Sequence, residues 1–172
     1  MSTPWRRKYI EGHEIEDGCV FCNALAKKED NSKNLIVHRG QRAFVIVNLY
    51  PYTNGHLMVA PMAHQPSLEL LDPETRAEMM ELTSQAIVLL KKVYRPQAFN
   101  LGANIGKAAG AGVPGHVHLH IVPRWTGDSN FMSILGETRV LPETIEETYK
   151  RIREGWDFSG SDGFCGFGKS EA

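Results

Sequence analysis

Three histidines that alternate with apolar residues constrain this chain more than any other feature. His116, His118 and His120 are separated by single apolar residues within VPGHVHLHIVPRW, residues 113–125. Because successive side chains of a β-strand point to opposite faces, this period predicts a strand with its apolar residues toward a core and three imidazoles on one face. Packing alone explains three neighbouring polar rings poorly, since each needs hydrogen-bond partners. We therefore favour a functional cluster. The alternatives are an exposed strand face and an adventitious metal site.

The composition is that of an ordinary single-domain protein. Its 172 residues suit one domain, and 42% hydrophobic residues are enough for a core. A formal net charge of −1 offers no electrostatic case for binding nucleic acid or a membrane. No apolar run approaches the roughly 18 residues of a transmembrane helix, and the basic N-terminus lacks the apolar segment of a signal peptide. Three cysteines, two of them in a C-x-x-C pair, favour a reducing cytoplasm over a disulfide framework.

Hydrophobic patterning and turn residues predict the order hairpin, strand, helix, two strands, helix. The predicted strands are residues 35–38, 43–47, 56–60, 99–105 and 116–122. A helix begins at Asp72-Pro73-Glu74, where Asp72 can cap free amides and Pro73 suits the first helical position, and it stops before Pro96. Residues 142–154 form the second predicted helix. The expected fold class is α+β, an antiparallel sheet with helices packed on it.

The histidine run resembles the signature of the histidine triad family of nucleotide hydrolases and transferases. CVFC at 19–22, NLYPYTNGHLMVAP at 48–61 and PRW at 123–125 are similar to the same family. The segments 127–131 and 4–6 resemble a bacterial subgroup that contains diadenosine tetraphosphate hydrolases and phosphorylases. The resemblance implies a homodimer with joined sheets. We divide the chain into an N-terminal arm (1–17), a nucleotide-binding catalytic domain (18–157) and a mobile, glycine-rich C-terminal tail (158–172).

The resemblance also implies roles for the histidines. His118, the middle member, would be the nucleophile that takes up a nucleoside monophosphate, and His120 would bind phosphate and help the leaving group. His56 follows Gly55 on a neighbouring predicted strand, and the resemblance implies that it hydrogen-bonds near the triad and orients it. From the residues alone, a buried histidine with satisfied hydrogen bonds explains His56 equally well.

A glycine-rich loop, residues 106–112, precedes the histidine run. Glycines let backbone amides approach an anion closely, so we expect phosphate contacts here, although a flexible connection is the usual explanation of such a loop. By resemblance, Asn104 contacts phosphate or ribose and Asn48 recognises the ribose hydroxyls; a turn asparagine is the alternative for Asn48. The expected nucleotide-binding residues are Asn48, Asn104, Gly110, Gly112 and Val113.

The C-x-x-C pair, Cys19 and Cys22, raises the question of a metal. Such a pair can be redox-active, half of a zinc site or two buried thiols, and the redox interpretation requires a helix in a βαβ context that the pattern does not show. His64 and His116 match the positions of the remaining ligands in zinc-containing relatives. The resemblance therefore implies a structural Cys₂His₂ zinc site that steadies the strand carrying the nucleophile.

These expectations combine into an enzyme that cleaves a dinucleoside polyphosphate, such as diadenosine tetraphosphate, through a nucleotidyl-His118 intermediate. A divalent cation that accompanies the substrate is compatible with this chemistry. We expect water rather than inorganic phosphate as the acceptor, because Lys107 and Arg124 are the only cations close to the motif in the sequence. A phosphorylase, a nucleoside phosphoramidase and a slow nucleotide-binding sensor are the alternatives, and a protein whose histidines only bind zinc is a further one.

Overall fold

The computed structural model describes residues 18–27, 29–128 and 143–161, with the side chains up to residue 156. The expected N-terminal arm lies outside the described residues, as does the expected tail beyond residue 161. The strands are β1 (Ile36–Arg39), β2 (Ala43–Val47), β3 (Leu57–Pro61), β4 (Ala98–Gly102) and β5 (Leu119–Arg124). The helices are α2 (Val20–Ala26), α3 (Pro73–Tyr94) and α5 (Ile145–Ser161), with 3₁₀ turns η1 (Leu68–Leu70) and η2 (Lys107–Ala109).

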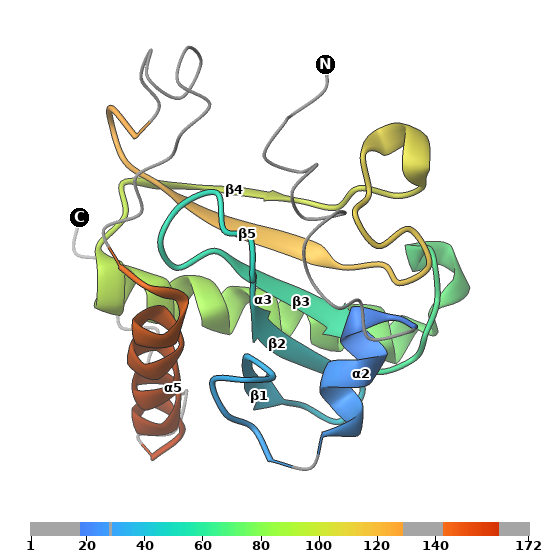
Figure 1. The fold of residues 1–172 in the computed structure, drawn as a ribbon, viewed down its shortest axis with the longest axis horizontal. Coiled ribbons are helices and arrows are strands. Elements are labelled where there is room, and N and C mark those ends of the chain that lie inside the picture. Colours follow the sequence, from blue (N-terminus) through green and yellow to red (C-terminus); the bar gives the residue numbers. More distant parts are fainter. Residues whose placement is uncertain (1–17, 28, 129–142, 162–172) are drawn as a thin grey trace, which may run out of the picture.

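The strands form one antiparallel sheet in the order β1-β2-β3-β5-β4 (Figure 1). The hairpin predicted from the turn residues is β1–β2, and β2 pairs with β3 along its whole length, Val45 opposite Val59. β5 lies between β3 and β4, so that Met58 of β3 faces His120 of β5. The predicted α+β class is therefore confirmed.

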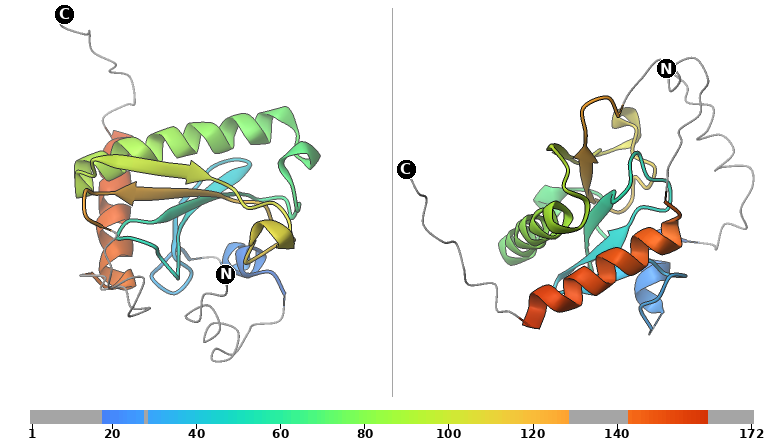
Figure 2. Two further views of the ribbon diagram at one scale, coloured as in Figure 1. Left: turned by 90° about the horizontal axis from the view of Figure 1, so that it is seen from above. Right: turned by 90° about the vertical axis from the view of Figure 1, so that its left-hand side faces the viewer.

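Helix α3 covers one face of the sheet, and α2 lies on the other side (Figure 2). The α3 start is the predicted one: the Asp72 carboxylate accepts a hydrogen bond from the Thr75 amide at 2.8 Å. Arg95 ends the helix in the left-handed conformation, at φ 48°. The helix buries a stripe at helical spacing against the strands, formed by Met79, Leu82, Ala86, Leu89 and Leu90. Among the described residues, no helix is both long and apolar enough to cross a bilayer.

The predicted end of the last helix, at residue 154, is wrong. The helix α5 continues to Ser161 because tertiary contacts outweigh the low helix propensity of Gly155. A Cβ at Gly155 would lie only 2.7 Å from Leu89 Cδ1, so the glycine permits α5 to pack closely on α3. One residue further on, Trp156 stacks on His38 of β1 at 4.9 Å. The close contact explains why a residue that usually weakens helices lies inside this one.

The predicted strand over residues 116–122 is shifted in the structure. Regular pairing begins only at Leu119 and continues through Arg124, so His120 alone of the three histidines lies in β5. The preceding residues have other partners: the Val117 amide donates to the Gln65 carbonyl at 2.7 Å. The strand predicted to reach residue 105 likewise ends at Gly102, which is the last β4 residue opposite β5. The histidines therefore come from a strand and from the irregular segment that leads into it.

Candidate active site and metal site

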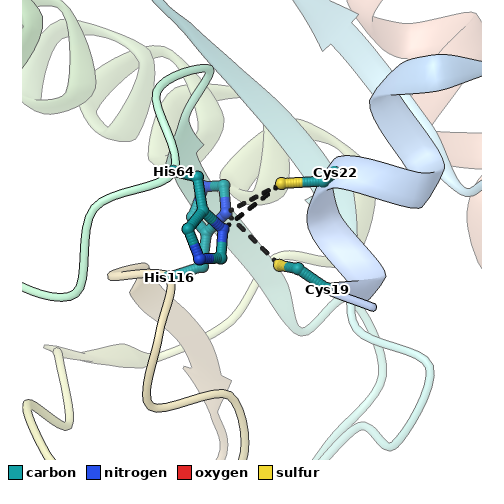
Figure 3. Close-up of side chains that lie close together, drawn as sticks. All are labelled: Cys19, Cys22, His64 and His116. Carbon is teal, nitrogen blue, oxygen red and sulfur yellow. Dashed lines mark hydrogen bonds between the residues drawn. The ribbon is translucent and has the colours of Figure 1, made fainter. Parts of the chain in front are cut away.

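Four side chains from three separate segments gather beside the start of β5 (Figure 3). Cys19 and Cys22 come from the N-terminal end of α2, His64 follows β3, and His116 precedes β5. Their ligand atoms all lie within 4.8 Å of one another. The Sγ of Cys22 is 3.3 Å from Nδ1 of His64 and 3.7 Å from Nδ1 of His116, and the Sγ of Cys19 is 3.4 Å from Nδ1 of His116.

These distances fit a tetrahedral zinc ion. Zinc–sulfur bonds of about 2.3 Å and zinc–nitrogen bonds of about 2.1 Å place neighbouring ligand atoms roughly 3.3–3.8 Å apart. The three sulfur–nitrogen distances given above, 3.3, 3.4 and 3.7 Å, fall in that interval. The fold thus brings the predicted set of four residues together. The Cys-x-x-Cys motif does open a helix, α2, which the sequence analysis did not predict. However, every strand pair in the described sheet is antiparallel, so the βαβ context of redox motifs is missing there.

Neighbouring groups determine the orientation of the His116 ring and the protonation of His116 and Cys22. The Nε2 of the fully buried His116 donates to the Pro61 carbonyl at 2.8 Å, which leaves Nδ1 as the ligand atom and orients the ring. Burial lowers the pKa of His116, so the ring is neutral, as a ligand must be. Burial and the adjacent Cys19 raise the pKa of the Cys22 thiol, and a bound cation would reverse this by displacing the proton.

His118 is held in one tautomer by the backbone. Its Nδ1 donates to the His116 carbonyl at 2.8 Å, so Nε2 carries the lone pair. Burial lowers the pKa of His118, which keeps the ring neutral and nucleophilic. The ring is only 4% exposed, and Phe21 of α2 packs on it with ring centroids 4.8 Å apart. The same phenyl ring lies 5.1 Å from the His116 ring, so α2 supports both histidines.

A chain of hydrogen bonds determines the protonation of His120. The Tyr52 amide can only donate, and it lies 3.1 Å from Nδ1 of His56, so that nitrogen is an acceptor and Nε2 carries the proton. The Nε2 of His56 is 3.0 Å from Nδ1 of His120 and therefore donates to it. The proton of neutral His120 then resides on Nε2. Asn48 belongs to this cluster, because its side-chain nitrogen lies 3.3 Å from Nδ1 of His56. Nothing in the sequence indicated the contact of the Tyr52 amide with His56, because a backbone group makes it.

The two catalytic candidates of the triad lie side by side with complementary protonation. The rings of His118 and His120 are 4.8 Å apart. One offers an unprotonated Nε2 and the other a protonated Nε2. The arrangement can attack an electrophile and protonate a leaving group from neighbouring positions.

The glycine-rich loop lies next to the histidines in the chain but contacts them little. Gly106 and Gly110 both have φ of 82°, which favours glycine, and a Cβ on Gly112 would meet open space. The Val113 carbonyl accepts a hydrogen bond from the His116 amide at 3.3 Å. Asn104 makes no hydrogen bond to any of the described histidines. The structure therefore joins Asn48 to the cluster, while Gly112 borders open space and Val113 packs partly against the core.

Comparisons with known proteins agree with the geometry. Residues 29–127 match the HIT domain, and the chain belongs to the HIT, or histidine triad, family. A protein of Mycobacterium tuberculosis named AP-4-A phosphorylase is 41% identical over 160 residues, which cover 90% of this chain and 82% of that protein.

Solved structures show the same fold. A zinc-bound histidine triad family protein from Mycobacterium smegmatis superposes with a TM-score of 0.67 at 27% identity, covering 84% of this chain and 97% of that one. A hypothetical histidine triad nucleotide-binding protein from Sulfolobus tokodaii gives 0.68 at 26% identity, covering 87% and 100%. The predicted Cys₂His₂ zinc site is confirmed by the clustered ligands together with the zinc-bound relative.

Proposed function

We propose that this protein is a nucleotidyl transferase that cleaves dinucleoside polyphosphates and passes the bound nucleotide to inorganic phosphate. The observation that carries the proposal is the fixed pair of protonation states on His118 and His120, which suits attack at phosphorus and departure of an oxygen leaving group. The substrate class and the acceptor are supported by the 41% identity to a protein named AP-4-A phosphorylase.

The first half-reaction uses both histidines. Nε2 of His118 attacks the α-phosphorus and forms a phosphorus–nitrogen bond, while the bond from that phosphorus to the bridging oxygen breaks. The proton on Nε2 of His120 moves to the departing oxygen, and His56 holds His120 in the donating tautomer. The His116 carbonyl stabilises the positive charge that develops on the His118 ring through the 2.8 Å hydrogen bond. From diadenosine tetraphosphate the products are adenosine triphosphate and adenylyl-His118.

In the second half-reaction an oxygen of hydrogen phosphate attacks the same phosphorus, and the phosphorus–nitrogen bond to His118 breaks. The phosphate proton returns to Nε2 of His120, and adenosine diphosphate is released. This acceptor is the alternative of the sequence analysis rather than its main expectation. The shortage of cations argues less strongly against it than expected, because backbone amides and neutral donors also bind anions. Arg124 is engaged elsewhere, with its Nε 2.6 Å from Asp128 and its Nη1 2.9 Å from Asn100. We therefore assign phosphate binding to the loop 106–112 and to His120.

We assign nucleotide recognition to Asn48, to Asn104 and to the loop that precedes His116. Asn48 would contact the ribose, Asn104 would contact ribose or phosphate, and the amides of Gly110, Gly112 and Val113 would surround the phosphates. The zinc site would have a structural role. When bound, the metal would tie α2 to His116, whose carbonyl in turn orients His118.

Product analysis on diadenosine tetraphosphate tests the acceptor. With millimolar phosphate, adenosine diphosphate and adenosine triphosphate should form in equal amounts, and cleavage should nearly stop when phosphate is removed. If adenosine monophosphate and adenosine triphosphate form equally fast without phosphate, the acceptor is water and the protein is a hydrolase. Absence of cleavage in both conditions would reject the substrate class.

We also propose a homodimer formed along β4. This strand lies at the edge of the described sheet, and four of its five residues are exposed, Leu101 at 46%. Ile105, just beyond the strand, is 43% exposed. An open apolar edge is a surface that a second copy can cover by continuing the sheet. Light scattering should give twice the chain mass for the native protein and a monomer for Leu101→Asp; a monomeric native protein would reject the dimer.

A further inference from the structure

We propose that Arg39 is a positioning residue for the zinc site, because it anchors the far end of the helix that carries both cysteine ligands. Arg39 touches none of the four ligands and lies on β1, in a different segment of the chain. The inference concerns the metal site alone and does not depend on the proposed reaction.

Helix α2 cannot hold its own shape. It has seven residues, whereas isolated helices shorter than about 12–15 residues are marginal in water. Cys19 occupies the N-cap position, yet its side chain makes no capping hydrogen bond. The first turn contains no acidic residue and the last turn contains no basic residue, Lys27 following only at the C-cap. The position of Cys19 and Cys22 therefore depends on what the rest of the protein does to α2.

Arg39 satisfies the carbonyl groups at the C-terminal end of α2. Its Nη1 donates to the Leu25 carbonyl at 3.1 Å, and its Nη2 donates to the Lys27 carbonyl at 2.9 Å and to that of Ala24 at 3.5 Å. The last carbonyls of a helix lack partners within the helix, and a positive charge is favourable there. A single guanidinium from β1 thus caps the helix, neutralises its end and ties it to the sheet.

The guanidinium itself is held in place. Nε and Nη2 of Arg39 lie 3.0 Å or less from the carboxylate oxygens of Asp30, in a bidentate pair. The side chains are 28% and 19% exposed. A planar group with five donors can serve a carboxylate and several carbonyls at once, whereas the single ammonium of lysine cannot reproduce this geometry. We therefore expect lysine to replace Arg39 only in part.

The metal and Arg39 act on opposite ends of α2, and Phe21, between the two cysteines, is buried. Without Arg39 the helix would lose its C-terminal anchor, and the metal would have to order α2 as it binds. That ordering cost would appear as weaker zinc binding, although all four ligands remain. Partners outside the ligand set typically change metal affinity by about 10- to 100-fold. We expect a loss in that range for Arg39→Ala and a smaller one for Arg39→Lys.

Competition with a chromogenic zinc chelator, on protein shown to be folded by circular dichroism, tests the proposal. Arg151→Ala is the matched control: Arg151 pairs with Glu143 at 2.7 Å and donates to the Val93 carbonyl at 3.2 Å, so its loss also removes an ion pair and a helix-end contact, but between α5 and α3. The control should lower the melting temperature and leave zinc affinity unchanged. Labelling of the metal-free protein with a thiol reagent should be faster for Arg39→Ala than for Arg151→Ala.

The proposal is overturned if Arg39→Ala binds zinc within about twofold of the native protein, or if Arg151→Ala loses as much affinity. If Arg39→Ala does not fold, Arg39→Lys and Asp30→Asn decide the question. Weaker zinc binding by both supports the anchor, and native affinity in both refutes it.

Discussion

Replacement of His118 by alanine should stop turnover and also weaken the fold. His118 is 4% exposed, packs on Phe21 with ring centroids 4.8 Å apart and donates to the His116 carbonyl, so its removal carries a cost in stability. The lost hydrogen bond contributes about 0.5–1.5 kcal/mol, and the buried ring contact adds roughly 1 kcal/mol. We therefore expect destabilisation of about 2 kcal/mol.

This loss is too small to explain the expected kinetic effect. A domain of ordinary stability, about 5–15 kcal/mol, stays folded after losing about 2 kcal/mol. Removal of a nucleophile should lower turnover by about 10⁴-fold or more, which corresponds to at least roughly 5 kcal/mol of transition-state stabilisation. Initial rates on diadenosine tetraphosphate and chemical denaturation of the same preparation separate the two effects. A folded variant that keeps more than about a tenth of the native rate would contradict the nucleophile assignment.

Three further predictions test the surrounding structure. His120→Ala should lower the catalytic constant by about 10²- to 10⁴-fold. The yield of the covalent intermediate should fall less with substrates whose leaving groups are more acidic, because these need less protonation, and an equal fall for all leaving groups would argue against proton donation by His120. The protein should contain one zinc per chain by elemental analysis, the Cys19→Ser/Cys22→Ser double variant should contain none and melt at lower temperature, and Cys165→Ser should retain the metal. Hydrogen bonds from Tyr94, Arg151 and Thr148 outweigh burial and lower the pKa of Glu143 below its usual 4.5. Because the folded-state pKa is the lower one, the stability it contributes is present above pH 4.5 and is lost as the pH falls through the folded pKa. Glu143→Gln should remove that part of the acid dependence of the melting temperature, and an unchanged acid profile would show that the ionised Glu143 contributes nothing to stability.

Local signals predicted the elements whose causes are local. The Asp72 cap and Pro73 located the start of α3, and alternation together with turn residues located the β1–β2 hairpin. The sequence alone also predicted that the metal ligands and the histidines would gather, because the family resemblance identified them. It missed the start of α5, although Thr144 and Glu147 form a capping box, with the Glu147 amide donating to Thr144 Oγ1 at 3.2 Å.

Only the tertiary structure decided which ring nitrogen of each functional histidine carries the proton. The sequence determined that His116, His118 and His120 recur at strand-like spacing and that His56 opens another predicted strand. The tautomers, however, depend on partners that are distant or carry no side-chain signal. The Pro61 carbonyl, 55 positions away, sets His116, and a backbone amide at Tyr52 sets His56 and through it His120. Local sequence likewise failed to predict helix α2. Its seven residues form a helix in a fold that buries Phe21 and places Arg39 against the last carbonyls. A local sequence encodes backbone preferences of a few tenths to about 1 kcal/mol per residue, whereas the position of a proton on an imidazole follows from which group the completed fold places opposite each nitrogen.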